Sequence, residues 1–402
     1  MKKLLLFTLC ISFIYMQGTF SGVTYFNYTY DLTEDAANDD GFALKRVYFT
    51  YQQELSEGIS YKFQTDVGQL DVFDYLDHDL TIIDPDDGFY FESYCENDEH
   101  GSMEECEADT TCGENGDEAC EWIVWTDPEE EEASADLTID SNTKKTQFVA
   151  YLKNAKIDWK SPIGKLTFGM QGMNIFNVAE KTWGFRFLEK SAMDKHGFSS
   201  SADMGIGYSG SIAGVHYSLM YTNGSGYKKS ETDKHKKISG QLVYGEKKLV
   251  KKDGFNVGTS FSIEPYDIES EEGDITIENK TVMAFFGGYA GNGLRLGAEF
   301  DIHTDAGTDV TQQIIAAYGS YKISDTLEIL TYIDLYDPNT KSEDDTTTDD
   351  IDESKDTETY VIAGINYYPT KGLTITPNMK FNFYETGNGD GAQFSVNFQF
   401  KF

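Results

Sequence analysis

The sequence lacks any apolar run long enough for a transmembrane helix, which needs about 20 residues. Its longest apolar stretch, residues 4–16, directly follows Lys2 and Lys3 near the start of the chain. A short apolar core behind basic residues and ahead of small residues is typical of a secretory signal peptide. We therefore predict that residues 1–21 are a signal peptide and that the protein is exported.

Basic residues are also scarce, because 32 lysines and arginines stand against 69 acidic residues and leave a net charge of −37. The only arginines are Arg46, Arg186 and Arg295. Nucleic-acid binding depends on basic surfaces that displace counterions from phosphates. The composition therefore excludes a nucleic-acid partner.

Catalytic motifs are missing as well. Gly205, Gly207 and Gly210 match a dinucleotide-binding spacing, but they lie on an alternating strand and its turn, with no helix after them. His216 and Ser218 are two residues apart on one strand, without a visible acid to orient the histidine. We predict that the protein is not an enzyme and carries no cofactor, apart from the calcium discussed below.

What the chain does contain is aromatic residues and strict alternation. It has 26 Tyr and 27 Phe within a modest hydrophobic fraction of 39%. Residues 392–402 set one apolar face, Ala392, Phe394, Val396, Phe398, Phe400 and Phe402, against polar residues between them. A strand of about 10 residues that ends on an aromatic residue fits a tilted crossing of a lipid bilayer. The pattern predicts a β-barrel in the bacterial outer membrane, in contact with its lipid.

The same alternation can be followed through residues 22–402 as sixteen antiparallel strands. The predicted strands are 23–30, 42–55, 59–67, 146–160, 166–170, 204–208, 215–221, 238–244, 255–263, 281–289, 294–302, 314–321, 327–336, 360–368, 373–384 and 392–402. Short turns and long loops alternate between them, as expected for periplasmic turns and external loops. Residues 245–254 fit poorly, because four lysines stretch this turn. A barrel of this size leaves a water-filled lumen, so the architecture predicts a channel.

The alternation also assigns side chains to the two faces. A lipid-facing Arg or Lys at mid-membrane costs about 2–4 kcal/mol, so charged residues on the strands should point inward. The predicted pore-lining residues on strands are Arg46, Lys62, Arg295, Glu299 and Asp301.

The loop at residues 174–203 has an apolar side with roughly helical spacing and four cations. An apolar loop is unfavourable in water, so we predict that it folds into the lumen as a constriction. Its cations, Lys181, Arg186, Lys190 and Lys195, would then face permeant solutes. The alternative is that this loop packs as an external cap.

A second long loop, residues 72–145, is acidic. Residues 72–143 hold 25 Asp and Glu and no Lys or Arg. Four cysteines in this loop, Cys95, Cys106, Cys112 and Cys120, predict two disulfides in one of three pairings, since the protein is exported. Carboxylate oxygens are the ligands that calcium takes, and the most compact acidic cluster is Asp84, Asp86, Asp87 and Glu92. The alternatives are a specific calcium site and a solvated acidic canopy that draws small cations toward the mouth.

Several segments together carry a family resemblance. They are Phe42 to Arg46, Gly58 to Gly68, Lys153, Asn154 and Ala155, Trp183, Gly184, Phe185 and Arg186, Ser201 to Gly207, and Tyr221 to Gly226. These segments resemble the phosphate-selective porins O and P, a family of bacterial outer-membrane proteins, and their broad porin relatives. The resemblance implies a trimeric barrel, an inward-folded loop and passive uptake of anions. The chain departs from the family in having three arginines, where anion selectivity of that kind relies on many.

The sequence therefore predicts a homotrimeric porin for passive diffusion of small hydrophilic solutes or ions. Its charge preference stays open, because the family implies anions or phosphate and the acidic loops indicate cations. The alternative function is a barrel-anchored surface protein whose acidic loop binds a partner or calcium.

Overall fold

The computed structural model describes residues 18–33, 40–71, 93–95, 122–124, 146–269, 275–340, 357–387 and 389–402. The chain divides into two compact units, of which one contains residues 1–69 and 148–402 and the other contains residues 70–147. None of the helices in the described ranges is long and apolar enough to span a membrane.

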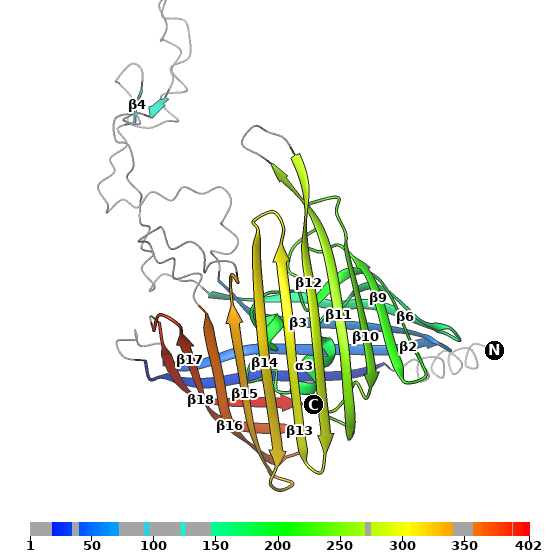
Figure 1. The fold of residues 1–402 in the computed structure, drawn as a ribbon, viewed down its shortest axis with the longest axis vertical. Coiled ribbons are helices and arrows are strands. Elements are labelled where there is room, and N and C mark those ends of the chain that lie inside the picture. The colour runs from blue at the N-terminus through cyan, green and yellow to red at the C-terminus, as the bar shows by residue number, and fades with distance from the viewer. Residues whose placement is uncertain are drawn as a thin grey trace, which may run out of the picture. The chain divides into compact units, whose positions relative to one another are not determined.

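The larger unit is a closed antiparallel barrel of sixteen strands (Figure 1). Its strands are β1 (Thr19–Asp31), β2 (Gly41–Ser56), β3 (Ile59–Asp71), β6 (Thr146–Ser161), β7 (Gly164–Gly172), β8 (Ala202–Ile212), β9 (Val215–Thr222), β10 (Lys237–Gly245), β11 (Gly254–Glu269), β12 (Ile275–Gly291), β13 (Leu294–Asp305), β14 (Val310–Lys322), β15 (Leu327–Asp337), β16 (Glu358–Thr370), β17 (Leu373–Tyr384) and β18 (Gly391–Lys401). The predicted fold class is confirmed.

The first and last strands close the barrel, with Val23 opposite Lys401 in the register of β1 and β18. The first strand begins at Thr19, which is earlier than the predicted start at residue 23 and inside the predicted signal peptide. Residues 1–17 lie outside the described part, so the signal peptide stays a prediction. The division of the chain into signal peptide and barrel is likewise untested.

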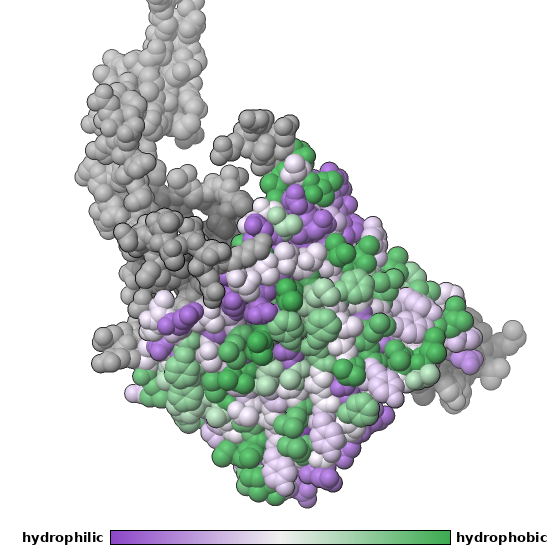
Figure 2. All heavy atoms as spheres, viewed as in Figure 1, coloured by the Kyte–Doolittle hydropathy of each residue, from purple (hydrophilic) through white to green (hydrophobic). Residues whose placement is uncertain are grey.

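Alternation along each strand separates the two faces of the wall. In β15, exposed Ile329, Ile333 and Leu335 alternate with buried Tyr332 and Asp334. Figure 2 shows hydrophobic side chains spread over the outside of the strands. The barrel thus presents an apolar surface outward and keeps polar and charged side chains inside, as a membrane barrel requires.

The two ends of the barrel differ. At one end, here named the turn end, tight turns join the strands; Asn292 and Gly293 form one of them, with φ of 53° and 79°, as a two-residue hairpin turn demands. The start of β1 and the end of β18 lie at this end, because Thr19 is opposite Gln52 near the turn after β2, and Lys401 N–H donates to the carbonyl of Gly372 in the turn between β16 and β17, at 2.8 Å. Short turns face the periplasm in outer-membrane barrels. The longer connections lie at the opposite, loop end.

The smaller unit contains a two-stranded sheet of β4 (Ser93–Cys95) and β5 (Trp122–Val124), with Cys95 opposite Trp122. Of the predicted disulfide cysteines, Cys106, Cys112 and Cys120 lie outside the described residues, as do the four residues of the predicted calcium cluster. Within the described ranges, no group of three or more His, Cys, Asp and Glu is placed to hold a metal ion.

Candidate functional site: a basic cavity beside an inner segment

Residues 174–203, here named the inner segment, run from the end of β7 into the first residues of β8 and lie inside the barrel. The segment forms two short helices, α3 (Asn177–Trp183) and α4 (Ala192–Lys195). Helix α3 ends at Gly184, whose φ of 77° allows its N–H to bond the carbonyl of Glu180. In Figure 1 this green segment lies among the strands of the barrel.

Polar contacts hold the start of the inner segment to three neighbouring strands. Asn174 Nδ2 donates to Ser218 Oγ of β9 at 3.1 Å, and Ser239 Oγ of β10 donates to Asn174 Oδ1 at 2.7 Å. Ser260 Oγ of β11 donates to the carbonyl of Ile175 at 2.5 Å. These side chains satisfy buried backbone and amide groups that would otherwise lose hydrogen bonds.

An apolar core joins the middle of the segment to the next strands. Trp183 is 1% exposed, and its ring centroid lies 5.7 Å from that of Tyr318 and 5.0 Å from that of Tyr332. Tyr318 also donates its hydroxyl to the carbonyl of Ala179 at 3.0 Å. The apolar side chains that recur at helical spacing in the sequence therefore form the face that packs against β14 and β15.

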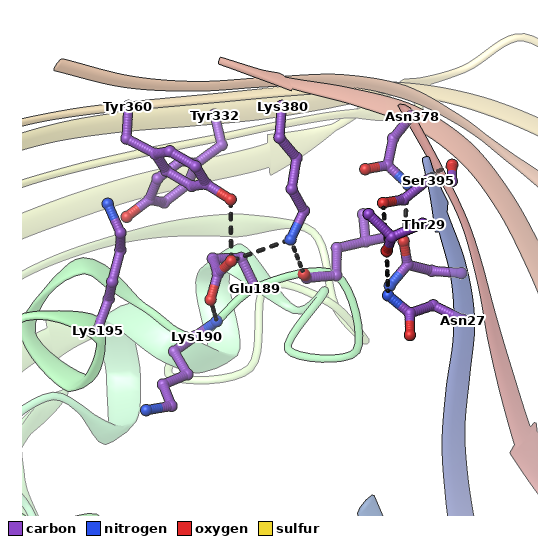
Figure 3. A network of polar contacts seen from close by, with 12 residues as sticks. Asn27, Thr29, Glu189, Lys190, Lys195, Tyr332, Tyr360, Asn378, Lys380 and Ser395 are labelled. Carbon is purple, nitrogen blue, oxygen red and sulfur yellow. Dashed lines mark hydrogen bonds and ion pairs between the residues drawn. The ribbon is translucent and has the colours of Figure 1, made fainter. Parts of the chain in front are cut away.

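An ion pair fastens the segment to the far wall (Figure 3). Lys380 Nζ of β17 lies 3.0 Å from Glu189 Oε2, and the Tyr360 hydroxyl of β16 donates to the same oxygen at 2.9 Å. Burial alone would raise the pKa of Glu189, but Lys380 and Tyr360 lower it to about 2. Glu189 therefore stays ionised, and the attachment persists, across the neutral and mildly acidic range.

The end of the segment is attached through Lys195. Its Nζ lies 3.1 Å from Glu358 Oε1, 3.5 Å from Asp334 Oδ1 and 3.8 Å from the ring centroid of Tyr360. Figure 3 shows Lys195 pointing toward this tyrosine. The segment thus crosses from β9–β11 to β15–β17, and the remaining lumen lies beside the wall made by β1–β3 and β6–β9.

That remaining space contains a cavity of about 630 Å³, here named the basic cavity. Seven lysines and one arginine line it, with Glu180 as its only lining carboxylate among the described residues. The lining cations are Lys62 of β3, Lys153 and Lys156 of β6, Lys165 of β7, Lys181 and Arg186 of the inner segment, and Lys247 and Lys248 between β10 and β11.

Half of these cations are neutralised by nearby carboxylates. Asp158 lies 3.1 Å from Lys156 and 3.2 Å from Lys165, Asp66 lies 3.5 Å from Lys153, and Arg186 pairs with Glu180 and Asp194. The other four form no ion pair with any described residue: Lys62, Lys181, Lys247 and Lys248. The cavity therefore carries excess positive charge.

Burial and nearby cations together lower the pKa of two lining lysines outside the strands, Lys181 and Lys247. Burial lowers the pKa of Lys181, and the nearby charges of Lys247 and Lys248 lower it further. Burial likewise lowers the pKa of Lys247, assisted by Lys165 and Lys248. Both lysines therefore lose their proton more readily than a lysine with the ordinary pKa.

A second connection also folds inward, from the loop between β9 and β10. The Tyr227 hydroxyl donates to Asp66 Oδ2 at 2.9 Å, where Asp66 also pairs with Arg46. Lys153 Nζ lies 4.9 Å from the ring centroid of Tyr227 and 5.3 Å from that of Tyr48. At this edge of the cavity, Arg46 and Lys153 are therefore positioned by ion pairs with Asp66 and by contacts with aromatic rings.

The structure sorts the predicted pore-lining residues into two groups. Lys62, Lys181 and Arg186 line the basic cavity, and Arg46 lies beside it in its pair with Asp66. Lys190 is half-buried and does not line the cavity.

The residues of the second group do not line the basic cavity. Lys195 holds the inner segment to the wall, and Arg295 donates to the carbonyl of Trp183 at 3.2 Å. Glu299 and Asp301 are 4% and 0% exposed. None of their carboxylate oxygens has a hydrogen-bond partner among the described residues. Alternation gives the inward direction of Arg295, Glu299 and Asp301 on β13, but it could not show that α3 would pack against this strand.

Sequence reasoning did not assign Lys153, Lys156, Lys247 and Lys248 to the pore. The alternation in β6 changes phase, since Leu152 and Ile157 are both exposed while Lys153 and Lys156 both line the cavity. Strict alternation would place these two lysines on opposite faces. The poor fit of residues 245–254 to a tight turn was the available signal for Lys247 and Lys248.

No protein family model matches the chain, and no curated protein matches its sequence. Solved structures do match. OmpF of Salmonella typhi, in complex with daunomycin, is 12% identical with a TM-score of 0.56, covering 96% of this chain and 98% of that one. OprB of Pseudomonas putida is 12% identical with a TM-score of 0.54, covering 98% and 96%. The outer membrane channel DcaP of Acinetobacter baumannii is 10% identical with a TM-score of 0.53, covering 96% and 97%.

The chain has a porin fold. At these identities the likeness concerns the fold. It does not single out phosphate-selective porins, which the sequence resemblance indicated. What passes through this particular barrel has to be argued from its own residues.

Proposed function

We propose that the protein is a bacterial outer-membrane porin that conducts small hydrophilic anions in preference to cations. The observation that carries the proposal is the basic cavity, where four lysines without ion pairs meet a single lining carboxylate. Charged rings at a narrow point select ions by sign, because each permeant ion passes within a few ångströms of them.

The inner segment is the constriction of this channel. It crosses the lumen and is fastened at its start, middle and end, so it leaves the basic cavity as the route for solutes. A fixed segment keeps the diameter of the channel and the charge of its lining constant, as passive diffusion requires. The wall accepts and donates hydrogen bonds at Asn174 and Ile175 and packs Tyr318 and Tyr332 against Trp183, which explains why an apolar loop is stable inside a polar lumen.

The acidic residues 72–143 act in the opposite sense, but over a limited range. Ionic screening reduces their field beyond about 8 Å at physiological salt. Cations of the cavity act at contact distance, so they dominate the choice between anions and cations. The acidic loop would instead raise the concentration of small cations in its own surroundings.

Conductance in planar bilayers tests the proposal. Refolded protein under a KCl gradient should give stable open steps and a reversal potential of the sign set by chloride. Lys181→Gln should reduce the anion preference, whereas Lys190→Gln, a matched change in the same segment outside the cavity lining, should leave it unchanged. A cation preference in the wild type would contradict the proposal. Silence from a folded barrel would favour the surface-anchor alternative.

We also propose that the barrel is a homotrimer in outer-membrane lipid. The structural neighbours include OmpT of Vibrio cholerae in a trimer form, 10% identical with a TM-score of 0.52, covering 96% of this chain and 99% of that one. Light scattering of the detergent-solubilised protein, corrected for bound detergent, would distinguish a mass near three times that of the mature chain from the mass of a monomer.

A further inference from the structure

Residues 246–253, here named the lysine turn, are unusual among the connections at the turn end. Eight residues separate β10 from β11, against four between β14 and β15 and two in each of the other five connections at this end. A two-residue turn is sufficient to join adjacent antiparallel strands. Reversal of the chain direction therefore does not require the six additional residues of the lysine turn.

The lysine turn folds into the barrel. Leu249 is 3% exposed and reaches the inner side of β12, where a Cβ added to Gly288 would lie 2.9 Å from Leu249 Cδ1 and 2.7 Å from Thr182 Cγ2 of α3. Val250 lies equally close to the end of α3, since a Cβ added to Gly184 would lie 2.6 Å from its Cγ2. The turn thus packs against the inner segment.

Hydrogen bonds fix the shape of the lysine turn. Asn256 Nδ2 donates to the carbonyl of Glu246 at 2.8 Å, and Lys248 N–H donates to Glu246 Oε1 at 2.9 Å. Lys251 N–H donates to the carbonyl of Lys248 at 2.8 Å. The lysine side chains therefore extend from a backbone whose conformation is fixed by hydrogen bonds.

This backbone separates four lysines into two pairs. Lys247 and Lys248 line the basic cavity together with Lys165 and Lys181, and they form no ion pair with any described residue. Lys251 and Lys252 are exposed and do not line the cavity, and Lys252 Nζ lies 3.6 Å from Glu246 Oε2. One short connection therefore supplies half of the unpaired cations of the cavity.

We propose that the lysine turn is a second selectivity element of the channel, in which Lys247 and Lys248 bind passing anions at the turn end of the cavity. The inference rests on the proposed anion-conducting function. An anion that leaves Lys181 on the inner segment meets the turn lysines next. Several weak sites in series let an ion enter and leave quickly, whereas one strong site would hold it.

Two matched double variants test this inference. Lys247→Gln with Lys248→Gln should lower the anion-to-cation permeability ratio by about three- to five-fold, in line with the loss of contact charges in a water-like medium. Lys251→Gln with Lys252→Gln removes the same charge from the same turn and should change the ratio little. Lys247→Arg with Lys248→Arg keeps the charge and should retain the wild-type ratio.

The outcomes separate this inference from the proposed function. A wild type without anion preference contradicts the proposed function itself. A wild type that prefers anions, with equal ratios in the two glutamine variants, overturns only the role of the lysine turn. If the first double variant does not fold, Lys248→Gln alone serves, because this side chain is exposed and its loss leaves the packing of Leu249 intact. An unchanged ratio in that variant also counts against the inference.

Discussion

The attachment of the inner segment to β16 and β17 can be tested by replacing Glu189 with glutamine. The change keeps the shape of the side chain but removes the charge that pairs with Lys380. Removing one partner of a buried ion pair costs about 3–5 kcal/mol. The side chains of Lys380 and Glu189 are 16% and 21% exposed, so we expect the lower end of that range, about 3 kcal/mol.

A loss of about 3 kcal/mol shifts the balance between attached and detached segment on the order of 100-fold. Detachment would widen the bore, so single-channel records of Glu189→Gln should show added conductance levels above the wild-type level. Glu385→Gln is the matched control, since Glu385 is exposed and the structure gives its side chain no ion pair among the described residues. Identical records from both variants and the wild type would refute the attachment.

Acid provides an independent readout of the same ion pair. The pKa of Glu189 is lowered from 4.5 to about 2 by Lys380 and Tyr360, against the effect of burial. A depressed carboxylate contributes stability above its ordinary pKa and loses it as pH falls toward the lower value. Wild-type conductance should therefore stay steady down to about pH 4.5 and become noisier only below it. Glu189→Gln should lack this pH dependence.

Three further outcomes follow from the same geometry. Trp183→Ala should lower the free energy of unfolding by about 3–5 kcal/mol, measured in a urea titration followed by the circular dichroism of the backbone. A loss below ~1 kcal/mol would contradict the packing role of Trp183. Anion preference should decline as pH rises from 7 toward 10, because Lys181 and Lys247 have lowered pKa values and lose charge before lysines with the ordinary pKa do; a flat profile of reversal potential would count against this. Glu299→Gln with Asp301→Asn should leave thermal stability unchanged or raised, because the native carboxylates lack hydrogen-bond partners among the described residues.

The barrel could be predicted from the sequence because its rule is local. Each strand alternates with a period of two, and lipid outside enforces the pattern strongly enough to read sixteen strands. The helical spacing of residues 176–188 likewise gave the buried face that now packs against Tyr318 and Tyr332. Local periodicity therefore sufficed for the wall and for the apolar side of the inner segment.

Which charged side chains form ion pairs could not be predicted in the same way, because pairing depends on residues far apart in the chain. Lys195 had the same expected role as Lys181, yet Asp334 and Glu358 neutralise it at the wall. Tyr227 reaches Asp66 across a separation of 161 residues. Periodicity specifies direction, whereas pairing depends on which groups the closed barrel brings together.

The overall charge of the chain is a poor guide to the selectivity of its pore. With 69 acids and 32 bases, an even mixture would give a cavity lined by about twice as many carboxylates as cations. Among the described lining residues the opposite holds, with eight cations and one carboxylate. Charges separated by more than about 8 Å are largely screened at physiological salt, so an acid farther than that from the cavity contributes little to the field inside it. The sign of the few charges that an ion touches, and not the sum over the chain, should decide what the channel conducts.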